Sequence, residues 1–272
     1  MHRSFFAVKD TFINSGSNLV DGTPFTDKNV GQDEVLEIKR DYVDHINKPW
    51  GHTIYSIGLT SDFRSKPFET VEAHIEILSK VLRDAEYDSF LYLSSTRVYF
   101  ESECTQESTN IKVNPTNKSD IYNISKLLGE ALCLNINKPS IRVARLSNVV
   151  DASDNSDNFV SSLIKEALEG EIILRSDPKS AKDYISLNDA LVILTKISLY
   201  GKSRIYNVAS GKLYEHIQWV NKIKRATTCK VKILENAPKQ IHDKIDIEKI
   251  SKEFSFTPSC PIEAVFKNKI NI

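Results

Sequence analysis

A short apolar run that ends in three hydroxyl residues is the feature that most constrains how this chain can fold. The run from Phe90 to Leu93 is long enough for one buried strand, and Ser94, Ser95 and Thr96 follow it directly. In an open α/β sheet, the side chains that bind ligands gather at the carboxyl ends of the strands. The stretch therefore predicts an α/β fold with a functional site beside these hydroxyl groups.

A tyrosine and a lysine follow this run at helical spacing. Tyr122 and Lys126 lie four residues apart, with Asp120 as an N-cap, so both side chains leave one face of a helix. A phenol titrates near ~10, too high for a base at neutral pH, and a nearby ammonium group lowers that pKa. The Ser95 hydroxyl can then hold the oxygen whose proton the tyrosine removes. The alternative is that Tyr122 and Lys126 are two solvated positions on an amphipathic helix.

The rest of the chain alternates short apolar runs with helical periodicity. Strands are expected near residues 53–57, 89–94, 141–147 and 204–209, and helices near 67–82 and 120–134. Such alternation is typical of an α/β fold with a mostly parallel sheet flanked by helices. We expect a smaller, C-terminal substrate-binding region to complete the molecule.

Composition excludes several classes of function. Lysine plus arginine balances aspartate plus glutamate at 36 each, so no net charge favours nucleic acid or a membrane surface. No apolar run approaches the ~18 residues that would span a bilayer. The four cysteines are scattered and the six histidines lack ligand spacing. We therefore expect no metal and reduced thiols, as in a cytoplasmic protein.

Several motifs together resemble one enzyme family. The segments SSTRVY, YNISK, RVARLSNVV, KDYISLNDA and RIYNVASG are similar to those of the extended short-chain dehydrogenase/reductases. The closest likeness is to the NAD-dependent nucleotide-sugar epimerase/dehydratase branch, and it covers about residues 51 to 265. The resemblance implies a Rossmann-like fold and an enzyme that transfers hydride and a proton.

The resemblance also implies roles for individual residues near the carboxyl ends of the strands. Tyr122 would be the catalytic base, Lys126 would lower its pKa and bind the nicotinamide ribose, and Ser95 would orient the reacting hydroxyl. Gly58, Ser147, Tyr122 and Lys126 would contact the cofactor, which is NAD or NADP. The helix expected near 67–82 carries His74. Many relatives have an asparagine at this position, and we expect a structural role for the histidine.

The expected substrate is a nucleotide-sugar or a related small molecule. By resemblance, Ser95, Asn148 and Lys182 would bind it, with Lys182 in place of an arginine that lies near the nucleotide phosphates. The expected domains are a divergent or truncated N-terminal segment at 1–50, a Rossmann-like core at 51–150 carrying the Ser/Tyr/Lys site, and a substrate-binding region at 151–272. Within that region, residues 183–210 would return to the core. A homodimer is compatible with this arrangement.

The chain departs from the family at its start. Relatives carry a strand followed by a GxxGxxG loop that opens a helix and wraps the cofactor pyrophosphate, and no GxxGxxG occurs anywhere in this sequence. We expect a shortened gene product or a degenerate homologue, with weakened cofactor binding.

The residues after Ser95 bear on the type of reaction. Dehydratases of this branch carry Asp-Glu there as an extra acid and base, whereas this chain has Thr96-Arg97. That favours an NAD(P)-dependent epimerase or ketoreductase. The rival hypothesis is a non-catalytic homologue that binds a nucleotide-sugar without holding the cofactor tightly.

Overall fold

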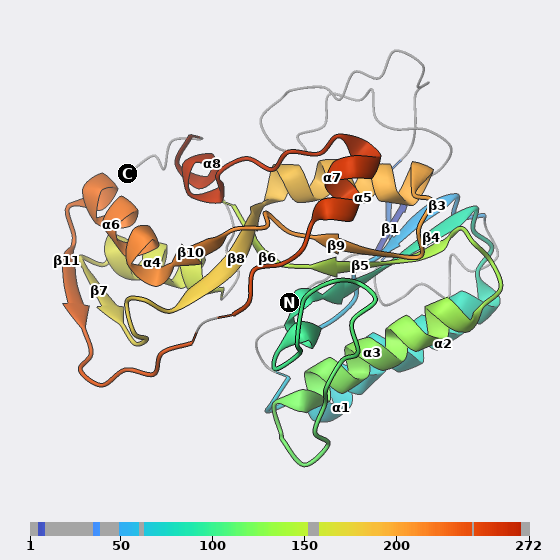
Figure 1. Cartoon of the computed structure of the whole chain (residues 1–272), viewed down its shortest axis with the longest axis horizontal. Helices are drawn as coiled ribbons and strands as arrows, with labels where there is room; N and C mark the ends of the chain where they lie inside the picture. The colour runs from blue at the N-terminus through green and yellow to red at the C-terminus, as the bar shows by residue number, and fades with distance from the viewer. Residues whose placement is uncertain are drawn as a thin grey trace. The chain divides into compact units, whose positions relative to one another are not determined.

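The computed structural model describes residues 5–8, 35–38, 49–59, 63–151, 158–240 and 242–267 (Figure 1). The chain divides into two compact units. The first unit takes residues 1–98, 111–145 and 192–206, and the second takes 99–110, 146–191 and 207–272. Most of residues 1–50, the segment expected to be divergent or truncated, lies outside the described residues.

The first unit is built on a mostly parallel, six-stranded sheet with the order β2-β1-β3-β4-β5-β9. Its strands are β1 (Phe5–Val8), β2 (Val35–Ile38), β3 (His52–Tyr55), β4 (Ser89–Ser95), β5 (Ile141–Leu146) and β9 (Ile205–Val208). The last four are the strands that the apolar runs predict, and the predicted Rossmann-like fold is confirmed.

The direction of β1 is not what the family pattern predicts. β3 and β4 pair in parallel, with Tyr55 opposite Tyr92, whereas β1 runs antiparallel to both β2 and β3. In a βαβ unit the first strand would instead run parallel to its neighbour, because a helix returns the chain across the sheet. The edge of the sheet beyond β3 is therefore made of antiparallel strands.

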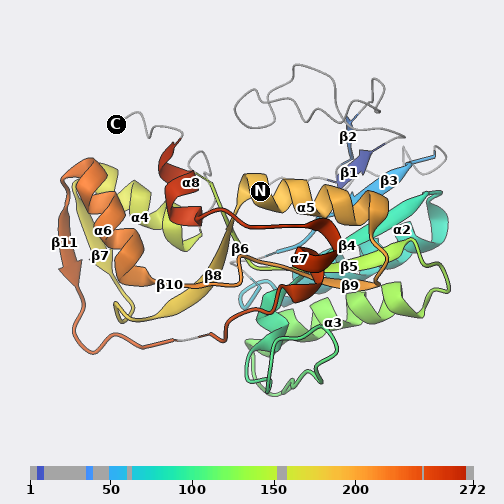
Figure 2. The same cartoon turned by 45° about the horizontal axis from the view of Figure 1, so that its top comes forward.

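Helices cover both faces of this sheet (Figures 1 and 2). One face carries α1 (Pro67–Val71), the π-helical turn η2 (Glu72–Glu76), α2 (Ile77–Asp84) and α3 (Asp120–Asn135). The first three follow one another without a break, so the predicted helix near 67–82 is confirmed with a π turn inside it. The C-terminal part of α5 (Leu187–Tyr200) lies on the other face, where the Ser89 hydroxyl donates to the Ser198 carbonyl at 2.8 Å.

Large aromatic side chains fill the core between this sheet and its helices. Tyr55, Phe90 and Tyr92 have no exposed surface, and the ring centroids of Tyr55 and Tyr92 lie 6.0 Å apart. A buried ion pair joins the layers, because Arg145 on β5 binds Glu130 on α3 at 2.7 Å. The same carboxylate accepts a 2.6 Å hydrogen bond from Ser94, the first hydroxyl after the apolar run. This pairing fixes the end of β4 against α3.

The second unit has two small sheets. One has the order β10-β8-β6, and the other pairs β7 with β11 in parallel. The strands are β6 (Asn148–Val150), β7 (Glu171–Leu174), β8 (Ala181–Ser186), β10 (Leu213–Glu215) and β11 (Lys230–Ile233).

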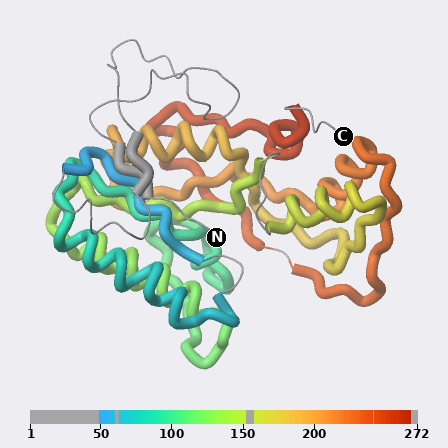
Figure 3. Tube along the Cα trace, turned by 180° about the vertical axis from the view of Figure 1, so that it is seen from behind, coloured from blue at the N-terminus to red at the C-terminus, as the bar shows by residue number. Residues whose placement is uncertain are grey.

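The second unit also contains helices. They are α4 (Phe159–Leu168), α6 (His216–Thr227), α7 (Glu248–Phe254) and α8 (Pro261–Lys267). Figure 3 shows α4 and α6 side by side in this unit, and both contribute to its core around Trp219. Among the described residues, no helix combines the length and the apolar character needed to cross a membrane.

Candidate functional site

The predicted site residues divide between the two units. Ser95 ends β4, Tyr122 and Lys126 lie on α3, and Gly58 follows β3, so these four belong to the first unit. Ser147, Asn148 and Lys182, predicted to bind cofactor or substrate, lie at the start of β6 or on β8 in the second unit.

Lys126 is held beside Tyr122 by the end of the neighbouring strand. Its Nζ atom donates to the Leu93 carbonyl at 2.9 Å and lies 5.9 Å from the centre of the Tyr122 ring. Both side chains are 94 % buried, so their interaction is weakly screened by solvent. The amphipathic-helix alternative predicts solvated side chains, and the burial of both residues does not fit it.

Gly58 lets the end of β3 approach α3 closely. A Cβ atom at this position would lie 2.9 Å from Nε2 of His74 and 3.4 Å from Nζ of Lys126. The first distance is shorter than real Cβ contacts, so a larger residue would have to displace the histidine. The absence of a side chain at Gly58 thus leaves room for the imidazole of His74 and the ammonium of Lys126.

His74 connects three segments around Tyr122. It lies in η2 with no exposed surface, and its Nε2 accepts from the Leu59 amide at 3.3 Å. The proton is therefore on Nδ1, which donates to the Ser125 hydroxyl at 2.8 Å, and Ser125 donates to the Tyr122 carbonyl at 2.9 Å. The imidazole also packs edge-on against the Tyr122 ring, with centroids 5.4 Å apart. This hydrogen-bonded chain fixes the turn of α3 that carries the tyrosine.

Arg97 lies between Ser95 and Tyr122. Its backbone amide donates to the Ser95 hydroxyl at 3.2 Å, in the short helix η3 (Thr96–Tyr99) that follows β4. Its guanidinium interacts electrostatically with Tyr122. The Phe63 ring packs on Tyr122 with centroids 5.1 Å apart. The reactive end of the first unit thus has a phenol, an ammonium, a hydroxyl and a guanidinium group.

The second unit arranges its predicted residues along β6 and β8. Asn148 pairs with Tyr184 in parallel register, and its side-chain amide donates to the Asp183 carbonyl at 2.8 Å. Lys182 pairs with Tyr214 of β10, near His216 at the start of α6. Burial lowers the pKa of His216 to about 4, with Lys182 and then His242 adding to the effect.

A buried carboxylate closes the turn after β9. Asp183 accepts from the backbone amides of Ser210 at 2.9 Å and Lys212 at 3.0 Å. Burial raises the pKa of Asp183 to about 6 in spite of these hydrogen bonds. The residue therefore ties the KDYISLNDA segment to the RIYNVASG turn within the second unit.

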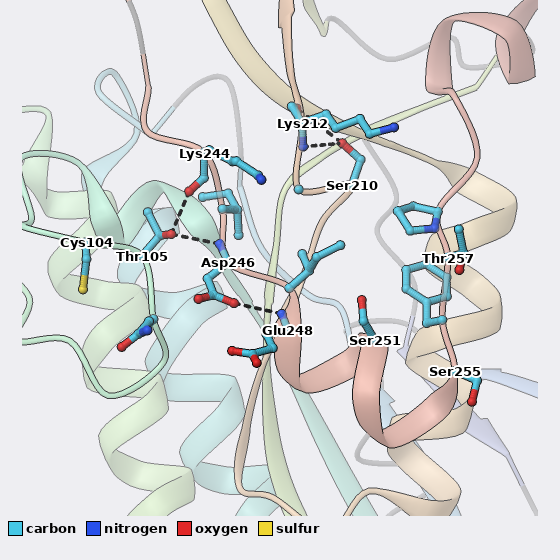
Figure 4. Close-up of a pocket in the computed structure, with 16 residues that line it drawn as sticks. Cys104, Thr105, Ser210, Lys212, Lys244, Asp246, Glu248, Ser251, Ser255 and Thr257 are labelled. Atoms are coloured by element: carbon cyan, nitrogen blue, oxygen red, sulfur yellow. Dashed lines mark hydrogen bonds between the residues drawn. The ribbon is translucent and has the colours of Figure 1, made fainter.

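A cavity of about 840 Å³ lies in the second unit and contains none of the predicted site residues (Figure 4). Thr105 joins two loops that line the cavity, because its hydroxyl donates to the Lys244 carbonyl at 2.8 Å and accepts from the Asp246 amide at 2.9 Å. Buried Asn207 holds the same loops from behind, with its amide donating to the Thr105 and Asp246 carbonyls. Two polar side chains at the cavity, Thr105 and Asp246, are thus engaged in shaping these loops.

The residues present fit one end of the cofactor that the resemblance implies. The Lys126 ammonium beside the Tyr122 ring is a donor group that suits the hydroxyls of the nicotinamide ribose. The pyrophosphate end is different, because the sequence has no GxxGxxG and β1 runs antiparallel to β3. The described residues thus offer a group for the nicotinamide end of NAD(P), while the sequence lacks the motif that binds the pyrophosphate in relatives.

Sequence reasoning overlooked part of this site. His74 was expected to be structural, yet its hydrogen bonds reach the carbonyl of Tyr122 through Ser125. Arg97 entered only as a residue unsuited to dehydration. Its place two residues after Ser95 was the available signal, whereas nothing in the sequence brings Phe63 next to Tyr122.

Comparisons with known proteins place the fold among nucleotide-sugar enzymes. The model of the NAD dependent epimerase/dehydratase family matches residues 53–209. A search of curated proteins by sequence finds no significant match.

Solved structures give the same result for the fold. RMD from Pseudomonas aeruginosa, complexed with NADPH, has 17% identity and a TM-score of 0.66, over 78% of this chain and 77% of that one. UDP-glucuronic acid 4-epimerase from Bacillus cereus, in complex with UDP-glucuronic acid and NAD, has 20% identity and a TM-score of 0.61, over 77% and 69%. The dTDP-glucose 4,6-dehydratase from Bacillus anthracis has 17% identity and a TM-score of 0.58, over 75% and 70%. At these identities the likeness shows the fold alone.

Proposed function

The chain belongs to the NAD dependent epimerase/dehydratase family, and from that membership we propose that it is a nucleotide-sugar epimerase or ketoreductase acting through Tyr122, Lys126 and Ser95. The observation that carries this proposal is the buried Lys126 ammonium, tied to the end of β4 and 5.9 Å from the Tyr122 ring. A buried cation at this distance favours the phenolate form of the tyrosine. A phenolate is the base that the reaction requires.

Each residue has a separate task in this proposal. Tyr122 takes the proton from the sugar hydroxyl at the carbon that is oxidised, and returns a proton on reduction. Ser95 orients that hydroxyl and stabilises negative charge on its oxygen. His74, acting through Ser125, keeps the tyrosine-bearing turn in place. A bound nicotinamide, from NAD or NADP, supplies the hydride acceptor.

Two features define the substrate class. The structural neighbours include enzymes in complex with UDP-glucuronic acid or UDP-glucose, which supports a nucleotide-sugar here. We assign the nucleotide part to Asn148 and Lys182, whose amide and ammonium groups suit phosphate oxygens. Thr96 and Arg97 lack the carboxyl groups for water elimination, which favours epimerisation or ketone reduction over dehydration.

A second function is favoured by one observation. Without a glycine loop, and with β1 antiparallel to β3, the chain is suited to bind a nucleotide-sugar while holding the cofactor poorly. A non-catalytic binding protein would have these properties.

Incubation of the purified chain with NAD or NADP and a panel of nucleotide-sugars distinguishes the two functions. An enzyme forms reduced nicotinamide, absorbing in the near ultraviolet, or an epimer detectable by proton NMR, and Tyr122→Phe abolishes both. A non-catalytic protein binds the nucleotide-sugar and gives neither signal, and the wild type and Tyr122→Phe then behave alike. Turnover that survives in Tyr122→Phe would reject the proposed base.

A further inference from the structure

Arg97 is a partly buried cation whose charge no carboxylate neutralises within the described part of the chain. Its Nε atom is buried and has no hydrogen-bond partner there. Its guanidinium has a single long contact, from Nη2 to the Ser119 carbonyl at 3.4 Å. A buried donor that finds no partner is costly, and its persistence points to a ligand.

A second guanidinium lies over the same aromatic ring as the first. The Phe63 ring centroid is 5.4 Å from Cζ of Arg97 and 4.5 Å from Cζ of Arg64. Burial, and then the charge of Arg64, lower the pKa of Arg97. The two like charges are thus close enough to disfavour each other, and an anion bound beside them would relieve that repulsion.

The acid that influences Arg97 among the described residues is already bound by other donors. Asp120 influences the charge of Arg97, but its two oxygens accept from the Asn114 amide at 2.8 Å and from the Asn123 side chain at 3.4 Å. No ion pair joins it to Arg97 among the described residues. Among the described residues, the Arg97 guanidinium is therefore open to an anion from a ligand.

The cation cluster of Arg97, Arg64 and Phe63 borders the proposed catalytic residues. Arg97 donates to the Ser95 hydroxyl through its backbone amide, and the Phe63 ring packs at a tilt against Tyr122 with centroids 5.1 Å apart. Because Tyr122 must contact the reacting hydroxyl, the sugar ring itself lies next to this cluster. An anionic group on that ring would fall within reach of the Arg97 guanidinium.

We propose that Arg97, with Arg64 beside it, binds a carboxylate carried by the sugar, so that the substrate of this site is a nucleotide-linked uronic acid. This inference rests on the proposed function, because it assumes that the sugar ring meets Tyr122. A guanidinium fork binds carboxylate and phosphate equally well in geometric terms. The carboxylate is favoured because the nucleotide phosphates are assigned to Asn148 and Lys182.

Titration calorimetry without any cofactor tests the assignment. The ligands are two matched pairs that differ only at the sixth carbon: UDP-glucuronic acid against UDP-glucose, and glucuronic acid 1-phosphate against glucose 1-phosphate. The second pair removes any dependence on the nucleotide base. We expect the carboxylated sugar to bind ~10- to 100-fold more tightly to the wild type, as for one charge-assisted contact.

The preference should disappear in Arg97→Gln and persist in the control Arg83→Gln, which alters an exposed arginine on α2. Arg97→Lys keeps the charge without the fork, so it should retain part of the preference. If circular dichroism shows that Arg97→Gln is unfolded, Arg97→Lys takes its place in the test. In the wild type, the carboxylated sugar should also shift the ¹⁵N resonance of the Arg97 Nε–H group, and the neutral sugar should not.

Three results would overturn the proposal: equal affinity for both members of a pair, a preference that survives in Arg97→Gln, or no binding of either pair at millimolar concentration. Equal weakening of acidic and neutral sugars by Arg97→Gln would assign the site to a phosphate instead, which also rejects it. These measurements need neither cofactor nor turnover. Failure of the uronic acid assignment can therefore be told apart from failure of the proposed reaction, which the turnover of Tyr122→Phe tests.

Discussion

At the residue scale, the proposed chemistry depends on one hydroxyl. Tyr122→Phe keeps the ring packing against Phe63 and His74 but deletes the proton acceptor, so turnover should fall by ~10²–10⁴-fold with the fold intact. Lys126→Met should move the rise of the rate to higher pH, because it removes the charge that favours the phenolate. Ser95→Ala should cost less than either. A pH–rate profile of the three variants checks these effects, and an unshifted Lys126→Met profile would contradict the assignment of the lysine.

The same scale shows what the sequence could reveal of the site. Serine, tyrosine and lysine have a recognisable spacing, so Ser95, Tyr122 and Lys126 could be predicted as site residues from the sequence. Arg97 and His74 were not assigned to the site, because their partners come from distant segments, at Phe63 and Ser125. A lone histidine on a helix is structural more often than functional. Only the fold shows that the hydrogen bonds of this one reach the tyrosine.

At the scale of elements, the spacing between α3 and β4 depends on one glycine. A Cβ at Gly129 would collide with the Tyr92 hydroxyl oxygen and lie 2.6 Å from its Cζ atom. The Tyr92 side chain is fully buried, so it cannot move away into solvent. Gly129→Ala should therefore lower the free energy of unfolding by ~1–3 kcal/mol, although alanine is the better helix former. Urea denaturation measures this change.

A paired substitution separates this contact from other effects of the alanine. The Tyr92 hydroxyl is buried and has no hydrogen-bond partner among the described residues, so Tyr92→Phe alone should be close to neutral. The double variant should regain part of the lost stability, because the hydroxyl is removed while the Cζ atom of the ring stays 2.6 Å from the new Cβ. Simple additivity of the two changes would show that the hydroxyl is not the source of strain.

The helix before β4 shows why element boundaries were predictable and their interior was not. Val71, Ile75, Leu78 and Leu82 recur at helical spacing, which correctly placed a helix near 67–82. The π turn at Glu72–Glu76 inserts one extra residue into the helical turn. Ala73 and His74 are buried in this turn, so the helix keeps one face toward the core. The turn presents His74 to α3, and such π turns are frequent at functional sites.

At the scale of the whole molecule, one buried acid should make stability depend on pH. The pKa of Asp183 is about 6 in the folded chain and near 4 in an unfolded one, so folding takes up a proton between these values. Stability from this group is full below about pH 4 and is lost as the pH rises through 6, by roughly 2–3 kcal/mol. Denaturation at a series of pH values measures the slope.

Asp183→Asn should flatten that slope, because it removes the charge while keeping one oxygen for the Ser210 or Lys212 amide. Asp243→Asn, at an exposed position, is the matched control and should leave the slope as it is. A slope that is unchanged in Asp183→Asn would show that other groups dominate between pH 4 and 6.

The overall fold was predictable from strand β3 onward and not before it. The apolar runs around Ile54, Leu91, Val143 and Tyr206 specify buried strands, and helical repeats between them imply parallel connections. The first residues lack the glycine signature that would have defined a parallel first strand, and the antiparallel pairing of β1 follows no motif in the sequence. Local sequence specified the parallel strands, including the one that ends at Ser95, much better than the edge of the sheet.

That difference leads to a prediction about the cofactor. In a Rossmann fold, the pyrophosphate binds backbone amides of the glycine loop and the positive end of a helix, interactions worth on the order of a few kcal/mol. This sequence has no such loop, so we expect NAD and NADP to bind at least ~10²-fold more weakly than to relatives that carry it. Titration calorimetry of the chain with NAD, NADP and free nicotinamide mononucleotide measures the loss. The mononucleotide lacks the pyrophosphate link and should bind about as well as the dinucleotides, and Lys126→Met should weaken all three. Micromolar or tighter binding of either dinucleotide would show that other residues of the chain take over the role of the loop.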